Sequence, residues 1–201
     1  AAATGGLGSV GRGLLLIALL LHVFSLRTAM FPDGQLHFGF ATALSATLWL
    51  SVAFYWIESF YSRIEGLPLI GLPLAALCAV LPSLVPAEHA VSNAGNPAFR
   101  LHFLVAMLAY SLFTLAAMHS LLMMALEKRL HHGRLSPFMA SFPPLLTMEQ
   151  ILFRLIHIAF ILLTLTLVSG ALFSEEMFGK ALTLNHKTVF AIISWLIFAA
   201  L

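Results

Sequence analysis

Apolar residues gather in long runs along this chain, and polar residues lie in the short segments between them. A helix needs about 20 apolar residues to cross a bilayer, whereas a transmembrane strand needs about ten residues of alternating polarity. Backbone polar groups cannot stay unpaired in lipid, which favours helices. The predicted fold class is therefore an all-α transmembrane helix bundle, one domain over residues 1–201. The expected spans lie near residues 13–30, 38–57, 67–85, 101–126, 151–173 and 186–201.

Composition agrees with a chain whose main partner is the lipid bilayer. Hydrophobic residues make up 61% of it and charged residues 9%, with a mean hydropathy of +0.99. A soluble domain carries about 25% charged residues. The net charge of +2 is spread over the loops without a basic face, which argues against nucleic-acid binding. Since the chain opens on a small-residue segment and stops inside an apolar run, we expect further spans beyond one or both ends.

The strongest cluster of basic residues indicates how the chain is oriented. Segment 127–149 carries Lys128, Arg129 and Arg134. Cytoplasmic loops of membrane proteins are enriched in Lys and Arg, so this loop is predicted to be cytoplasmic. Aromatic side chains often mark the membrane interface. Those expected to do so at the same inner side are Trp49, Tyr55, Trp56 and Tyr61.

Four histidines form the candidate chemistry of the spans, where ionisable side chains are costly and often functional. His119 and His157 each lie about seven residues, or ~10 Å, from the inner ends of consecutive spans. His102 and His186 both begin spans at the outer boundary. Neutral imidazole is a good axial ligand for haem iron, and facing helices can present one imidazole to each side of the macrocycle. The spacing thus makes these two pairs candidate ligands of haem iron.

Other interpretations remain open on the spacing alone. A single intramembrane histidine more often hydrogen-bonds a neighbouring helix, and nine histidines will match in depth partly by chance. The chain would then be a cofactor-free membrane scaffold or partner subunit. A small-molecule permease is disfavoured because no predicted span carries a buried Asp or Glu. The sequence shows no nucleophile triad, phosphate loop or converging carboxylates, so no catalytic residue is assigned and a classical enzyme is not expected.

Three stretches resemble the CcsA-type cytochrome c assembly proteins, in the right order between Arg100 and Leu201. Residues 184–199, LNHKTVFAIISWLIFA, are similar to the helix that follows the family's tryptophan-rich haem loop. Residues 101–110 resemble the helix that opens with an external histidine, and residues 157–170 the helix that leads into the haem loop. The residues that coincide with the family's pattern in the first stretch are Lys187, Trp195, Leu196, Ile197 and Ala199.

The resemblance implies a multi-pass protein of the bacterial inner membrane that moves haem outward, or holds it at the outer face for attachment to apocytochrome c. Haem and other cytochrome c assembly proteins would be its partners. His102 matches the family's first external ligand, and depth makes His119 and His157 counterparts of its intramembrane pair. Residues 173–185 contain no Trp, and Asn185 and His186 stand where the family has Asp and Pro. The chain therefore resembles the shorter, YpjD-type branch, which lacks the tryptophan-rich loop.

Overall fold

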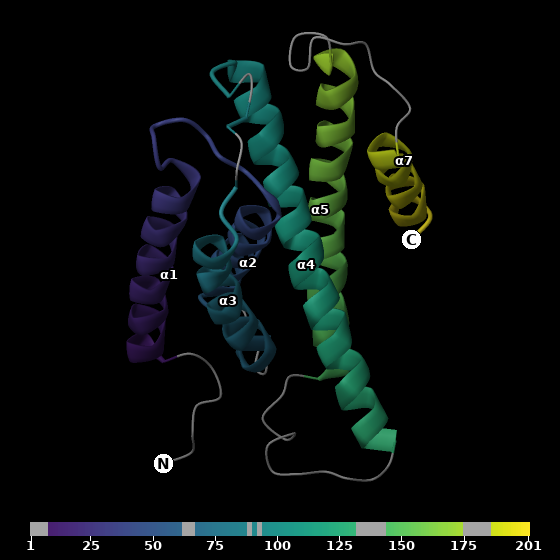
Figure 1. The fold of residues 1–201 in the computed structure, drawn as a ribbon. Coiled ribbons are helices and arrows are strands. Elements are labelled where there is room, and N and C mark those ends of the chain that lie inside the picture. Colours follow the sequence, from purple (N-terminus) through teal and green to yellow (C-terminus); the bar gives the residue numbers. More distant parts are fainter. Residues whose placement is uncertain (1–7, 62–66, 88–89, 92–93, 132–143, 175–185) are drawn as a thin grey trace.

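The computed structural model describes residues 8–61, 67–87, 90–91, 94–131, 144–174 and 186–201. These ranges fold into helices with no strand among them, as Figure 1 shows, which confirms the predicted all-α class. The helices are α1 (Ser9–Met30), α2 (Phe40–Glu58), α3 (Leu67–Leu84), α4 (Pro97–His131), α5 (Leu145–Leu172) and α7 (His186–Ala199).

Four of these helices are long and apolar enough to cross a membrane, namely α1, α2, α5 and the Pro97–Arg129 part of α4. The other two contain shorter apolar segments, Gly71–Leu84 in α3 and Thr188–Ala199 in α7. The chain is thus a polytopic helical membrane protein.

The two longest helices extend past the apolar runs that predicted them. The fourth span was expected to end at residue 126, but α4 continues to His131 through Glu127, Lys128 and Arg129. Glu, Lys and Arg are strong helix formers, so charge ends the apolar run without ending the helix. Likewise, α5 begins at Leu145, directly after Pro144. Most of the predicted cytoplasmic loop 127–149 lies outside the described residues.

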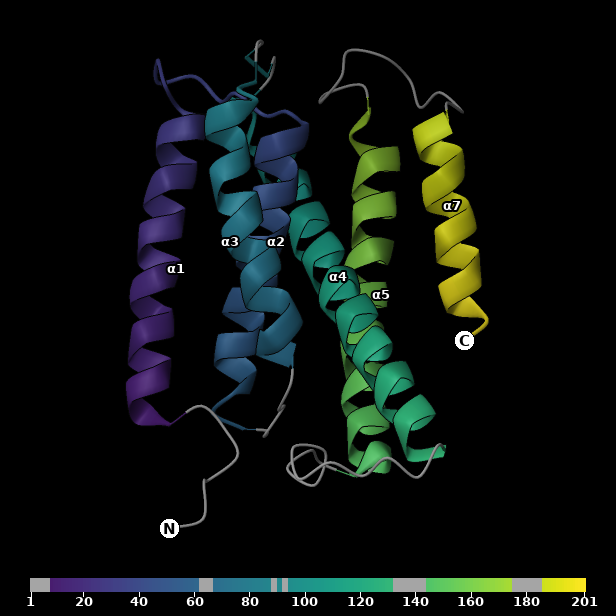
Figure 2. The same ribbon diagram turned by 60° about the horizontal axis from the view of Figure 1, so that its bottom comes forward.

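The helices run up and down in a bundle, with α4 and α5 as a long antiparallel pair (Figures 1 and 2). Helices α1, α2 and α3 lie on one side of this pair, and α7 packs along α5 on the other (Figure 2). The core between them holds buried apolar side chains such as Leu48, Leu112 and Met148. We call one end of the bundle the His102 end. The helix termini that meet there are Met30, Phe40, Leu84, Pro97, Leu172 and His186.

Polar side chains join the helices where the apolar surfaces meet. Ser51 is buried, and its single hydroxyl hydrogen is shared between the carbonyls of Thr47 and Ser111, which lie 2.8 and 2.9 Å from Oγ. The indole N–H of Trp49 donates to the carbonyl of Leu19 at 2.9 Å, in the middle of α1. Trp49 therefore joins α2 to the middle of α1, and Tyr55 is buried near the end of α2.

Candidate functional site

His102 lies in the first turns of α4 and faces the last turns of α5. Its Nδ1 is 2.9 Å from the hydroxyl oxygen of Ser169. A Cβ on the next residue, Gly170, would stand 3.3 Å from His102 Cε1, closer than most such contacts allow. The absence of a side chain at Gly170 is what lets the imidazole lie against the backbone of α5.

The hydrogen bonds of Ser169 indicate which nitrogen of His102 carries the proton. The Ser169 hydroxyl donates to the carbonyl of Thr166 at 3.1 Å. A carbonyl can only accept, and a serine hydroxyl has one hydrogen to give. With that hydrogen directed to the Thr166 carbonyl, Ser169 Oγ accepts the hydrogen of His102 Nδ1–H. In the neutral ring, the lone pair is consequently on Nε2, the nitrogen that most often binds iron or another metal.

The same reasoning gives His119 the opposite tautomer. Its Nε2–H donates to the carbonyl of Met148 at 2.9 Å, in the first turn of α5. The side chain is 0% exposed, and its buried Nδ1 has no hydrogen-bond partner among the described residues. The nitrogen that would ordinarily bind iron is therefore already engaged in joining α4 to α5.

His157 is exposed on α5 and donates from Nδ1 to the carbonyl of Phe153, one turn earlier, at 2.7 Å. Its lone pair is therefore on Nε2, as in His102. Because His119 meets α5 at Met148, His157 lies ~13 Å further along that helix at ~1.5 Å per residue. The structure brings His119 to the first turn of α5 and not to His157.

His186 is the first residue of α7 and is exposed at the His102 end (Figure 1). Helix α7 is held against α5 by Trp195, whose indole N–H donates to the hydroxyl of Thr164 at 2.9 Å. Phe198 stacks on Phe113 of α4, with ring centroids 4.3 Å apart. His102 and His186 thus share one end of the bundle, on helices that both pack against α5.

A further intramembrane histidine joins two helices. His22, half-buried in the middle of α1, has its Nε2 2.9 Å from the hydroxyl of Ser45 on α2. Nothing in the sequence indicated this partner. Within the described ranges, no cluster of three or more His, Cys, Asp or Glu residues could hold a metal ion.

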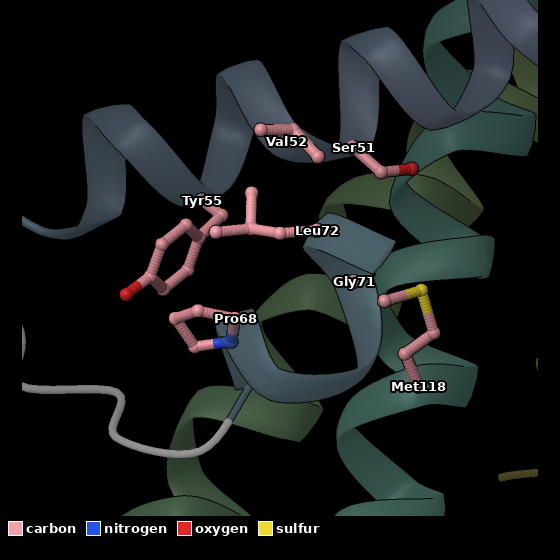
Figure 3. Close-up of a pocket in the computed structure, with 7 residues that line it drawn as sticks. All are labelled: Ser51, Val52, Tyr55, Pro68, Gly71, Leu72 and Met118. Carbon is pink, nitrogen blue, oxygen red and sulfur yellow. The ribbon is translucent and has the colours of Figure 1, made fainter. Parts of the chain in front are cut away.

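A small internal hollow between α2, α3 and α4 has the wrong size and chemistry for a cofactor. Figure 3 shows Ser51, Tyr55 and Met118 around it, with Met118 reaching toward Gly71. Its volume is about 10 Å³, the space of a single water molecule. A Cβ at Gly71 would stand 2.9 Å from the Met118 methyl carbon, so this glycine makes room for the thioether. The hollow is a packing feature.

Comparison with known proteins assigns the chain to a family. The family model "Cytochrome C assembly protein" matches residues 12–201. The inner membrane protein YpjD of Escherichia coli K12 is 25% identical over 195 residues, 92% of this chain and 70% of YpjD. The protein HemX of Brevibacillus brevis is 25% identical over 187 residues, 87% of this chain and 68% of HemX.

A third relative is more similar over a shorter stretch. The cytochrome c biogenesis protein CcsA of Picosynechococcus is 38% identical over 66 residues, 33% of this chain and 19% of CcsA. No solved structure shows significant similarity to the chain. Since the family model covers most of the sequence, the chain belongs to the cytochrome c assembly protein family.

Proposed function

We propose that this protein binds and handles haem at the His102 end of the bundle, as part of cytochrome c assembly. Family membership supports a haem-related membrane function. The observation that carries the proposal is the hydrogen bond between His102 Nδ1 and Ser169 Oγ, at 2.9 Å. It holds the ring in one orientation and places the lone pair of the neutral ring on Nε2, the nitrogen suited to iron.

The residues around His102 fit this ligand. A haem would supply an iron centre that binds an imidazole nitrogen. Ser169 holds the opposite nitrogen of the ring, in the way that outer hydrogen bonds usually orient a ligating histidine. Gly170 gives the imidazole a close seat on α5, since a Cβ there would crowd Cε1. His102 is thus positioned by two consecutive residues of the facing helix.

His186 is the proposed second outer ligand. It begins a helix at the same end of the bundle, and its side chain is exposed. Helix α7 is fastened to α5 further along, at Trp195 and Thr164. The first turn of α7 would therefore present an imidazole at the same end of the bundle as His102.

An inner haem site built from His119 and His157 is a second part of the proposal. Unlike the outer site, it requires a change of conformation. His119 would have to release the carbonyl of Met148 before Nε2 could bind iron. The two rings would also have to approach along α5. We therefore expect haem at the inner pair only in a conformation where the first turn of α5 has moved away from α4.

We further propose that the protein lies in the bacterial inner membrane with loop 127–149 on the cytoplasmic side, and works with other cytochrome c assembly proteins. The name of the related inner membrane protein YpjD supports a location in the inner membrane. The basic residues Lys128 and Arg129 at the end of α4 support the orientation. The His102 end would then face outward, where apocytochrome c receives haem.

Absorption spectroscopy tests the haem proposal directly. The protein would be purified in mild detergent from cells supplied with a haem precursor, as wild type and as single variants. We expect a Soret band with sharp reduced α and β bands, lost or shifted in His102→Ala and His186→Ala. His22→Ala is the matched control, because His22 is an intramembrane histidine bonded to Ser45 and outside both proposed pairs. A Soret band unchanged in the variants of all four proposed ligands would overturn the residue assignment.

A cofactor-free scaffold is the second candidate function, and one observation favours it. Two intramembrane histidines already bridge helices, His22 to Ser45 and His119 to Met148. In this case the imidazoles would act as polar contacts between spans. Folded protein that stays free of Soret absorption despite ample haem supply, and that purifies with the same assembly proteins after His102→Ala, would support the scaffold over the haem site.

A further inference from the structure

A second feature of the His102 end is a hollow of about 790 Å³, lined by the end of α1, the loop that follows it and the first turns of α4. Its volume falls within the roughly 300–1,000 Å³ of small-molecule sites. Most of its wall is apolar and aromatic, which is typical of a binding pocket. The residues that matter here are Met30, Phe31, Leu36, Phe99, Arg100 and Phe103.

Backbone hydrogen bonds fix the two loops that frame this hollow. His37 N–H donates to the carbonyl of Met30 and Val91 N–H to that of Leu36, each at 2.7 Å. His37 also forms an isolated antiparallel bridge with Ala90. The α1–α2 and α3–α4 connections are thus joined to each other, and the hollow is formed before any ligand arrives.

The α4 side of the hollow carries one cationic group, Arg100, placed to meet an anion. Its Nε–H donates to the carbonyl of Ala94 at 2.8 Å, which fixes the side chain along the loop. This carbonyl is the partner that the described structure gives the guanidinium. The two terminal nitrogens keep the planar fork that recognises carboxylate or phosphate through paired hydrogen bonds.

We propose that this hollow binds an amphipathic anion, with its apolar body against Phe99 and Phe103 and its carboxylate or phosphate on Arg100. The hollow lies where α1 ends and α4 begins. Both helices are long and apolar enough to cross a membrane, so we expect their ends at this side to lie near the lipid headgroups. Two sources offer this chemistry there, the phosphate of an anionic phospholipid and the propionate carboxylates of a tetrapyrrole. The proposal is independent of the histidine ligands, because His102 faces α5 and does not line the hollow.

Binding to the full chain in detergent tests the proposal, with two ligand pairs that differ in charge. Native mass spectrometry would compare phosphatidylglycerol with phosphatidylcholine, and fluorescence titration would compare protoporphyrin IX with its dimethyl ester. We expect at least one anionic ligand to bind the wild type roughly tenfold more tightly than its uncharged or zwitterionic counterpart. The pair that shows this preference identifies the source. The variant Arg100→Gln should abolish the preference.

Matched variants separate this pocket from general charge and from the histidine site. Arg27→Gln removes an arginine in the last turn of α1, at the same end but outside the hollow, and should keep the preference. Leu104→Trp should fill the hollow and weaken both ligands while leaving Arg100 in place. His102→Ala should bind the anion as the wild type does, even if it loses haem iron ligation.

Three outcomes would overturn the proposal. One is a wild type that prefers neither anionic ligand. Another is an Arg100→Gln protein that keeps the preference as fully as Arg27→Gln does. The third is unchanged binding in Leu104→Trp, once its thermal unfolding shows that the variant is folded like the wild type.

Discussion

The hydroxyl of Ser169 accepts a hydrogen bond from Nδ1 of His102 across the α4–α5 contact, at 2.9 Å. Its own hydrogen goes to the carbonyl of Thr166, so its donor capacity is already used. The serine therefore selects one neutral tautomer of the histidine and holds the ring in one rotamer. This is the relationship on which the proposed haem site depends most directly.

Removing the Ser169 hydroxyl should remove the preference of His102 for one tautomer. In Ser169→Ala we expect the His102 ring to change from mainly Nδ1–H to a mixture of both tautomers, because Nδ1 loses its acceptor. Ser169→Thr keeps a hydroxyl at the same place and should restore the wild-type state. Nitrogen-15 NMR of the histidine ring in protein without haem makes the measurement. A wild-type ring found mainly as Nε2–H would mean that Ser169 donates to the ring, and would contradict the assignment.

Gly170→Ala tests how closely the His102 imidazole approaches the backbone of α5 at Gly170. The new Cβ would stand 3.3 Å from His102 Cε1, so the ring must shift by a few tenths of an ångström. Alanine also favours the helix over glycine by about 1 kcal/mol. We expect the unfolding free energy to rise by less than this amount and the His102 ring resonances to move.

Gly13→Ala in α1 is the matched control, because its Cβ would meet no atom within 4 Å. It should give the helix-propensity gain without moving the resonances of His102. Equal stabilisation in both variants, with the ring resonances of His102 unmoved, would show that Gly170 leaves the imidazole more room than the structure indicates.

His119→Ala should destabilise the bundle far more than His157→Ala. The first change leaves the Met148 carbonyl without its donor and opens a cavity at a fully buried position, a combined cost of about 2–4 kcal/mol. The second removes an exposed ring whose hydrogen-bond partner in the described part of the chain is Phe153 of its own helix, and should cost less than about 1 kcal/mol. Reversible unfolding in mixed micelles measures both. Comparable losses would argue that His119 is not the interhelical contact described here.

The α1–α2 loop should depend on pH through Asp33. The backbone N–H of Gln35 donates to this carboxylate at 3.0 Å, and with His37 as the next cause it holds the pKa of Asp33 below its usual range. A carboxyl group with a lowered pKa stabilises the fold above its ordinary pKa of about 3.9, and that contribution is lost as the pH falls through the lowered value.

The amide resonance of Gln35 should report this titration. We expect it to shift at a pH below the ordinary pKa of an aspartate, and to stay constant above it. Asp33→Asn removes the carboxylate and should remove the shift. A midpoint at or above the ordinary value in the wild type would contradict the hydrogen-bonded arrangement of this loop.

The helices could be predicted from the sequence because lipid leaves an apolar run few other choices. Their ends could not, since Glu127, Lys128 and Arg129 leave the apolar run yet favour the helix. Hydropathy marks where the hydrocarbon ends, and helix propensity decides where the helix ends. The depths assigned to His119 and His157 relied on the first of these limits.

The hydrogen-bond partners of the histidines could not be predicted from the sequence for a different reason. Whether His119 meets Met148 or His157 depends on how far α4 and α5 slide past each other, and an apolar run does not specify this offset. Ser169 and Gly170 were noted within a stretch that resembles the family. Their contact with His102 required the packed pair of helices, because all three residues belong to one site only when α4 and α5 are in register.

Two hydrogen bonds join α4 and α5 near opposite ends of their contact, His102 with Ser169 and His119 with Met148. A shift of one helix along the other by one helical turn, ~5.4 Å, would break both hydrogen bonds at once. Helices α4 and α5 should therefore move as one rigid unit with a fixed register, while the smaller helices can shift relative to them. Breaking the His119–Met148 hydrogen bond alone would leave His102 bonded to Ser169. The two helices would then separate at the Met148 end while they keep their register at the His102 end.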